Sequence, residues 1–178
     1  NHEVDTKYIR AASEALAPHL RPGALVVLES TSPPGTTEDM ANHLIELRPD
    51  LSLNEEDDNA IFVAHCPERV LPGQIMEEME NNDRVIGGLT PKGTELARDL
   101  YGTFCTAELL MTNATTAEMA KLTENSFRDV NIAFANELSL ICDRLGIDVW
   151  ELIELANHHP RVNILQPGPG VGLSLIHI

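Results

Sequence analysis

Apolar residues follow two different spacings along the first two thirds of the chain. Short continuous apolar runs lie at 24–30, 60–66, 84–88 and 107–112. Stretches with helical spacing lie before the first run, at 6–20, and between later runs, at 36–47 and 91–104. A short apolar run bounded by turn residues is typical of a strand that is buried on both faces of a parallel sheet. Because strands alternate with helices, we predict right-handed crossovers and a doubly wound α/β sheet.

The pattern changes after Asn113. We expect Thr115 or Thr116 to cap a helix that runs to about Leu145, because neither Gly nor Pro interrupts this stretch. Such a helix is about 45 Å long. One face repeats apolar residues at spacings of three and four, which predicts burial in a core: Phe127, Val130, Phe134, Leu138, Ile141 and Leu145.

A second helix is predicted to begin after Asp148 and to end before Pro160. The sequence therefore predicts three parts. Residues 1–112 form the α/β part, residues 113–172 form a helical domain, and residues 173–178 form a short tail.

Charge and cysteine content narrow the function. Twelve Lys and Arg against 28 Asp and Glu give a net charge of -16, which argues against binding to nucleic acid or to an anionic membrane surface. We expect neither a signal peptide nor a membrane span, since no apolar run approaches the length that either requires. Three widely spaced cysteines without zinc-ligand spacing favour reduced thiols, no metal site and a cytoplasmic location.

Polar residues follow the first two predicted strands, where open α/β sheets bind their ligands. The first strand leads into "STSPPGT" (30–36) and the second into "CPERVLPG" (66–73). Glu68 could act as a base there, but an exposed turn glutamate explains the same pattern equally well.

Polar and charged residues at two further places could take part in a reaction or bind a ligand. Lys121 and Asn125 are four residues apart on the long helix, and together they could hold an oxygen that becomes negative during a reaction. The alternative is a lysine that reaches to solvent. Arg161 could pair with a phosphate or a carboxylate, or could interact with the C-terminal helix dipole.

Five motifs in order give the sequence a family resemblance. They are "LESTSPPGTTE", "HCPERVLPG", "NDRVIGG", "TAEMAKLTENSFRDVNIAFANELSLIC" and "HPRVNILQPGPGVG". With them the chain resembles the UDP-glucose/GDP-mannose dehydrogenase family. The resemblance implies the second half of a Rossmann-type NAD-binding domain, followed by a long helix and a small all-α dimerisation domain. It also implies oxidation of the C6 alcohol of a UDP-sugar to a carboxylate, with NAD as the cofactor.

The resemblance also assigns roles to residues. Ser30 and Thr31 would bind the cofactor, with Thr31 beside the nicotinamide, and Glu68 would assist hydrolysis of a covalent intermediate. Lys121 and Asn125 would orient the reacting oxygen. The implied substrate-binding set is Arg69, Val70, Leu71, Lys121, Asn125, Arg161, Gly168 and Gly170. Arg161 would reach the substrate of a neighbouring subunit, in a homodimer built on the long helix.

The chain also departs from the family pattern. Pro72 stands where the glucose branch has a glutamate, which favours the branch that acts on UDP-N-acetyl-D-mannosamine. We call "PGPGVG" (167–172) the glycine loop. The family continues "GHC" after this loop and uses that cysteine as nucleophile, whereas Leu175 stands here. The sequence also has no G-x-G-x-x-G fingerprint and does not begin with Met. We therefore expect an internal segment of a longer enzyme, without turnover of its own and with an unrelated tail.

Two alternatives to this function remain. A β-hydroxyacid dehydrogenase also places a lysine and an asparagine four residues apart on a long helix, but it needs neither the "PERVLPG" loop nor a thioester. A non-catalytic module that binds nucleotide sugars or dimerises is the other alternative.

Overall fold

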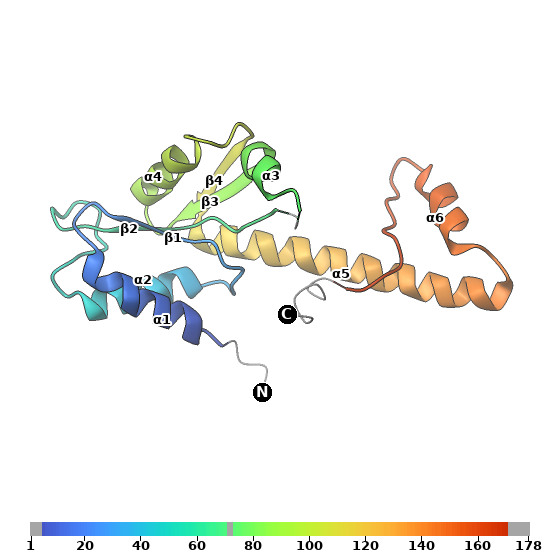
Figure 1. The fold of residues 1–178 in the computed structure, drawn as a ribbon, viewed down its shortest axis with the longest axis horizontal. Coiled ribbons are helices and arrows are strands. Elements are labelled where there is room, and N and C mark those ends of the chain that lie inside the picture. Colours follow the sequence, from blue (N-terminus) through green and yellow to red (C-terminus); the bar gives the residue numbers. More distant parts are fainter. Residues whose placement is uncertain (1–4, 71–72, 171–178) are drawn as a thin grey trace. The chain divides into compact units, whose positions relative to one another are not determined.

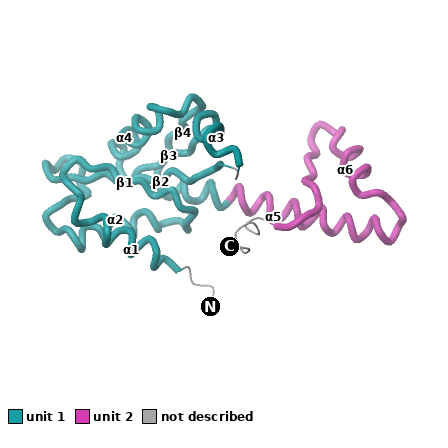
Figure 2. The backbone as a smooth tube through the Cα atoms, in the orientation of Figure 1, with its two compact units in different colours: residues 1–122 teal, residues 123–178 magenta. Residues whose placement is uncertain are grey.

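The computed structural model describes residues 5–70 and 73–170. The backbone divides into two compact units, Asn1–Leu122 and Thr123–Ile178 (Figure 2). The division falls inside one long helix, α5 (Ala114–Leu145), so each unit is described by itself.

The first unit is built around a four-stranded sheet of order β1-β2-β3-β4 (Figure 1). Its strands are β1 (Leu25–Leu28), β2 (Phe62–His65), β3 (Arg84–Gly88) and β4 (Leu109–Asn113). Its helices are α1 (Lys7–Leu16), the 3-10 turn η1 (Ala17–His19), α2 (Thr36–Leu47), α3 (Ile75–Asn81) and α4 (Pro91–Tyr101). The predicted strand at 84–88 and the predicted helix at 36–47 have these bounds in the structure.

Alternate residues of β1 face two different cores. Val26 and Leu28 pack into a core with α1 and α2, whereas Leu25 and Val27 pack against Ala97 and its neighbours on α4. Figure 1 shows α1 and α2 on one side of the sheet and α4 on the other. A strand that is apolar on both faces therefore forms the middle layer of three, as a continuous apolar run predicts.

The expected parallel sheet is wrong at one pairing. β1 and β2 are parallel, and so are β3 and β4, but β2 and β3 are antiparallel through Ala64 with Gly88 and His65 with Gly87. A parallel return requires a crossover element that packs on the sheet. In the described part of the 66–83 connection, the helix α3 has seven residues and buries none of them. The chain therefore turns back on itself, and β3 runs opposite to β2.

The second unit contains the rest of α5 and α6 (Val149–Asn157). Asp148 caps α6 as predicted, since its side chain accepts hydrogen bonds from the amides of Trp150 and Glu151. The cap at the start of α5 differs from the prediction: Asn113, rather than Thr115 or Thr116, accepts a hydrogen bond of 2.8 Å from the Thr116 amide. Within the described ranges, no helix has the length and apolarity that crossing a membrane requires.

The apolar face of α5 is exposed in the single chain, contrary to the predicted burial. The exposed fractions are 65% for Phe127, 68% for Val130, 51% for Phe134, 50% for Ile141 and 66% for Leu145. Together with the half-buried Leu138 we call these residues the α5 stripe. The helix forms as predicted, but within this chain the stripe is exposed to solvent.

Candidate functional site

The loop after β1 presents two hydroxyl groups. Ser30 and Thr31 are exposed, while Ser32 is buried. The loop ends at Gly35, whose φ of 97° is readily adopted only by glycine, and α2 begins at the next residue. The Thr36 hydroxyl donates to the Pro33 carbonyl at 2.7 Å and closes this turn. We call residues 30–35 the hydroxyl loop.

The loop after β2 is joined to the end of β1. The Glu68 amide donates to the Glu29 carbonyl at 3.2 Å, so the predicted base and the hydroxyl loop lie at the same edge of the sheet. The Glu68 carboxylate is exposed and accepts a hydrogen bond from the Val70 amide. Arg69 is half-buried and donates to the Asp83 carbonyl at 3.0 Å, while Leu71 and Pro72 lie outside the described residues.

Helix α5 reaches this edge through a residue that the sequence analysis did not single out. Glu118 is 1% exposed, and its carboxylate accepts hydrogen bonds from the amides of Gly35 and Thr37, both at 2.7 Å, and from the Thr37 hydroxyl at 2.6 Å. Lys121 follows three residues later and is half-buried. The structure therefore brings the hydroxyl loop and the helix that carries Lys121 into direct contact.

Buried polar groups surround this contact. His65, the last residue of β2, is fully buried, and neither ring nitrogen has a hydrogen-bond partner among the residues that the structure describes. Burial lowers the pKa of His65, while the nearby Glu118 carboxylate and the Leu28 carbonyl partly oppose this effect. Within residues 5–70 and 73–170, the buried Ser32 hydroxyl has no hydrogen-bond partner either. The edge of the sheet is thus polar below its surface as well as on it.

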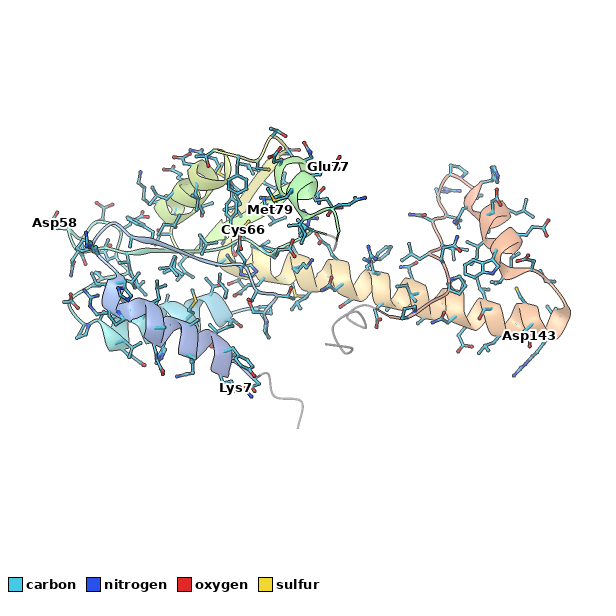
Figure 3. The ribbon with its side chains drawn as sticks, viewed as in Figure 1. Lys7, Asp58, Cys66, Glu77, Met79 and Asp143 are labelled. Atoms are coloured by element: carbon cyan, nitrogen blue, oxygen red, sulfur yellow. The ribbon has the colours of Figure 1, made fainter. Side chains whose placement is uncertain are left out.

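Cys66, labelled in Figure 3, follows β2 on the face that carries α4. Burial raises the pKa of its thiol, which favours the thiol over the nucleophilic thiolate. The neighbouring Tyr101 donates to Glu29, and burial raises its pKa too. All three cysteines are free and buried, so none is placed as an exposed nucleophile.

Two asparagines of the second unit hold the predicted glycine loop. Asn136 on α5 donates to the Gly168 carbonyl at 2.9 Å and accepts from the Gly168 amide at 2.8 Å. Asn157 on α6 makes the same pair of bonds with Ile164, at 2.9 and 2.7 Å. Each side-chain amide pairs with loop backbone as a neighbouring strand would, and we call these pairs the asparagine clips.

The remaining predicted substrate residues also lie in the second unit. A Cβ added at Gly170 would lie 2.5 Å from Oδ1 of Asp129, so the loop passes close to α5 at this point. Asn125 is half-buried, and Arg161 is exposed just after α6. Among the described residues, no three His, Cys, Asp or Glu side chains gather as metal ligands.

The structure thus joins some predicted residues and leaves others in a separate unit. Ser30, Thr31 and Glu68 share one edge of the sheet, and Lys121 lies on the helix that contacts it. Asn125, Arg161, Gly168 and Gly170 belong to the second unit. Glu118 and both asparagine clips were not predicted from the sequence. The spacing of Glu118 three residues before Lys121 was the one available signal for Glu118.

Comparison with known proteins identifies the family. The family model described as "UDP-glucose/GDP-mannose dehydrogenase family, NAD binding domain" matches residues 1–105, and that of the family's central domain matches residues 115–177. The chain is 63% identical over 174 residues to a UDP-N-acetyl-D-mannosamine dehydrogenase of Yersinia pestis, and 62% identical to that of Escherichia coli (strain K12). Each match covers 97% of this chain and 41% of the relative.

Solved structures give the same result. A UDP-D-ManNAc dehydrogenase from Pyrococcus horikoshii superposes with a TM-score of 0.87 at 52% identity, over 94% of this chain and 39% of that one. The UDP-N-acetyl-mannosamine dehydrogenase Cap5O from Staphylococcus aureus superposes with a TM-score of 0.83 at 48% identity, over 94% of this chain and 40% of that one. On the extent of these matches, the chain belongs to the UDP-glucose/GDP-mannose dehydrogenase family and carries part of its NAD-binding domain.

Proposed function

We propose that the chain is part of an NAD-dependent enzyme that oxidises the C6 alcohol of UDP-N-acetyl-D-mannosamine to the uronate. The observation that carries the proposal is the identity of 63% over 174 residues to a relative of that name. The proposal concerns a larger protein, because the chain spans 41% of the length of that relative.

The proposed roles follow the chemistry of each side chain. Ser30 and Thr31 bind NAD, with Thr31 beside the nicotinamide, and their exposed hydroxyls at the carboxyl edge of the sheet fit this role. When NAD is bound, it accepts the hydride. Lys121 and Asn125 hold the C6 oxygen and favour its negative charge as the C–H bond breaks. Glu68 is exposed at the same edge as the hydroxyl loop, where a carboxylate can activate water.

The proposed substrate contacts come from two stretches. Arg69 and Val70 approach the sugar nucleotide from the loop after β2. Leu71 is proposed to bind the substrate too, and lies outside the described residues. Arg161, Gly168 and Gly170 approach the sugar nucleotide from the stretch that follows α6. The clip between Asn136 and Gly168 supports this proposal, since it holds the backbone of the loop against α5. Two glycines at this point let a ligand approach the backbone closely.

The proposed organisation places the C-terminal part of the NAD-binding domain at 1–112 and the central helical domain at 113–172. The tail at 173–178 remains a prediction, since it lies outside the described residues. We also propose a cytoplasmic location, which three free buried thiols support.

The proposed assembly is a homodimer through α5. Five large apolar side chains of the α5 stripe are at least half exposed, and a contiguous apolar surface of this kind marks an interaction site. A second copy of the chain would bury the stripe against itself, as symmetric dimers do.

Two assays test the proposed activity. The chain alone, mixed with NAD and UDP-N-acetyl-D-mannosamine, should produce no sustained NADH. A chimaera tests the full reaction: residues 5–170 of this chain replace the matching stretch of the Escherichia coli relative, which supplies the remaining sequence on both sides. NADH production by the chimaera with UDP-N-acetyl-D-mannosamine, above that with UDP-glucose, is the expected result. A chimaera that folds but oxidises neither sugar would refute the proposal.

A further inference from the structure

We propose that Glu118 is a positioning residue, whose carboxylate fixes the hydroxyl loop against the helix that carries Lys121. The inference rests on the proposed function for the roles of Thr31 and Lys121. Its structural part, the link between α5 and the start of α2, lies within the first unit and is independent of those roles.

The first step concerns the start of α2. The first amides of a helix have no partner within the helix, and a side chain at the capping position usually satisfies one of them. Here the capping position is Gly35, which has no side chain. Glu118 satisfies the amides of Gly35 and Thr37 from 83 and 81 residues away in the sequence. The cap of α2 is therefore supplied by α5.

The second step concerns rigidity. A buried carboxylate is stable only when protein hydrogen bonds replace those it makes with water. Glu118 accepts three such hydrogen bonds, from two amides and one hydroxyl, at 2.6 to 2.7 Å. The positive end of the α2 dipole adds to this stabilisation. Two oxygens that hold three donors leave the carboxylate little freedom, so the contact sets the distance between α5 and the loop.

The hydroxyl loop joins Gly35 to Thr31 through a stiff stretch of chain. Thr31 lies four residues before Gly35, and Pro33 and Pro34 lie between them. Proline rings fix φ, so this part of the loop is stiff. The Thr36 hydroxyl also closes onto the Pro33 carbonyl at 2.7 Å. Fixing Gly35 therefore restricts the positions that Thr31 can take.

The same helix carries Lys121 beyond Glu118. Lys121 is three residues after Glu118, and positions three and four apart share one face of a helix. Asn125 is seven residues after Glu118 and falls on the same face by spacing. Glu118 thus links the loop that carries Thr31 to the helix that carries Lys121.

The experiment uses the chimaera and compares Glu118→Gln with a matched substitution, Glu137→Gln, at an exposed position of α5. Glutamine keeps the size of the side chain, but its NH2 group faces the Gly35 amide or the Thr37 donors and cannot accept from them. We expect Glu118→Gln to lower kcat about 100-fold, since a misplacement of about 1 Å costs a factor of this order. KM for the sugar nucleotide should change little.

Three readouts separate positioning from folding. With substrate deuterated at C6, the isotope effect on kcat should rise in Glu118→Gln, because hydride transfer becomes the slow step. Thr37→Val should lower kcat to a smaller extent and Thr37→Ser should restore it, because serine keeps the hydroxyl that donates to Glu118. Melting temperatures are measured alongside. A lower melting temperature with unchanged kcat and isotope effect would show that Glu118 only stabilises the fold, and would overturn the proposal.

Failure of the inference and failure of the proposed function give different results. If the unsubstituted chimaera folds but is inactive, the proposed function fails. Amide hydrogen exchange of the 178-residue chain then tests the link itself: exchange at Gly35 and Thr37 should be faster in Glu118→Gln than in Glu137→Gln. Equal exchange in the two variants would overturn the link.

Discussion

The clip between Asn136 and Gly168 gives a prediction with a magnitude. Substituting Asn136 by alanine removes two hydrogen bonds, of 2.9 and 2.8 Å, that hold the glycine loop to α5. Each such bond contributes about 0.5–1.5 kcal/mol net, so the free energy of opening the loop should fall by about 1–3 kcal/mol. At about 1.4 kcal/mol per factor of ten, exchange of the Gly168 amide should accelerate roughly 5- to 150-fold.

The assay is amide hydrogen exchange of the chain, followed by NMR or by mass spectrometry of peptides that cover the loop. Asn131→Ala is the matched control, because Asn131 is also on α5 and makes one bond, of 2.7 Å, to the Phe127 carbonyl within the helix. Both substitutions replace asparagine by the best helix former, so the gain in helix propensity cancels between them.

Two outcomes decide the reasoning. Protection of the Ile164 amide should persist in Asn136→Ala, because Asn157 holds it independently. Equal exchange of Gly168 in Asn136→Ala and Asn131→Ala would refute the claim that the clip holds the loop. Asn136→Asp should fall between wild type and alanine, since its carboxylate can accept from the Gly168 amide but repels the Gly168 carbonyl.

Three further predictions concern stability and assembly. Burial lowers the pKa of His65 from its ordinary 6.5, so the unfolded chain binds this proton at higher pH than the folded chain; stability should fall as pH drops below about 6.5, and urea unfolding of His65→Leu should lack this component. Gly87→Ala should cost about 1–3 kcal/mol in thermal unfolding, because its Cβ would lie 2.1 Å from the Asn113 carbonyl oxygen. Replacing Val130 and Phe134 by glutamate should convert the proposed dimer to a monomer in sedimentation velocity.

Each of these predictions has a control. His158→Leu changes an exposed histidine and should keep the pH dependence of wild type. Gly168→Ala places its Cβ in open space and should leave unfolding nearly unchanged. Ser126→Glu adds a charge at an exposed polar position of α5 and should leave the mass of the assembly unchanged. A variant that behaves like its control contradicts the corresponding prediction.

Much of the fold could be predicted because local pattern determines it. The helix at 36–47, the strand at 84–88 and the Asp148 cap each depend on residues close together in the sequence. Strand direction does not depend on local pattern. An apolar run has the same pattern in a parallel and in an antiparallel pair. The antiparallel pairing of β2 and β3 goes with α3, which buries no residue and so does not form a crossover packed on the sheet.

The candidate site could be predicted only in part for a related reason. Loops after strands are expected to gather at one edge, and the bond from Glu68 to Glu29 joins two of them. Glu118 makes its bonds with residues 81 and 83 positions away, a separation that no periodicity reports. The α5 stripe was assigned to a core because spacing identifies an apolar face without identifying what covers it.

The division of the chain inside α5 has a consequence for how this family can vary over evolution. The two units meet between Leu122 and Thr123, with Lys121 on one side of the division and Asn125 on the other. Inserting or deleting one residue there would rotate everything downstream by about 100° around the helix axis. Asn125 would leave the face that it shares with Lys121. Surface loops in general tolerate insertions and deletions, whereas this stretch of helix is expected to keep its length.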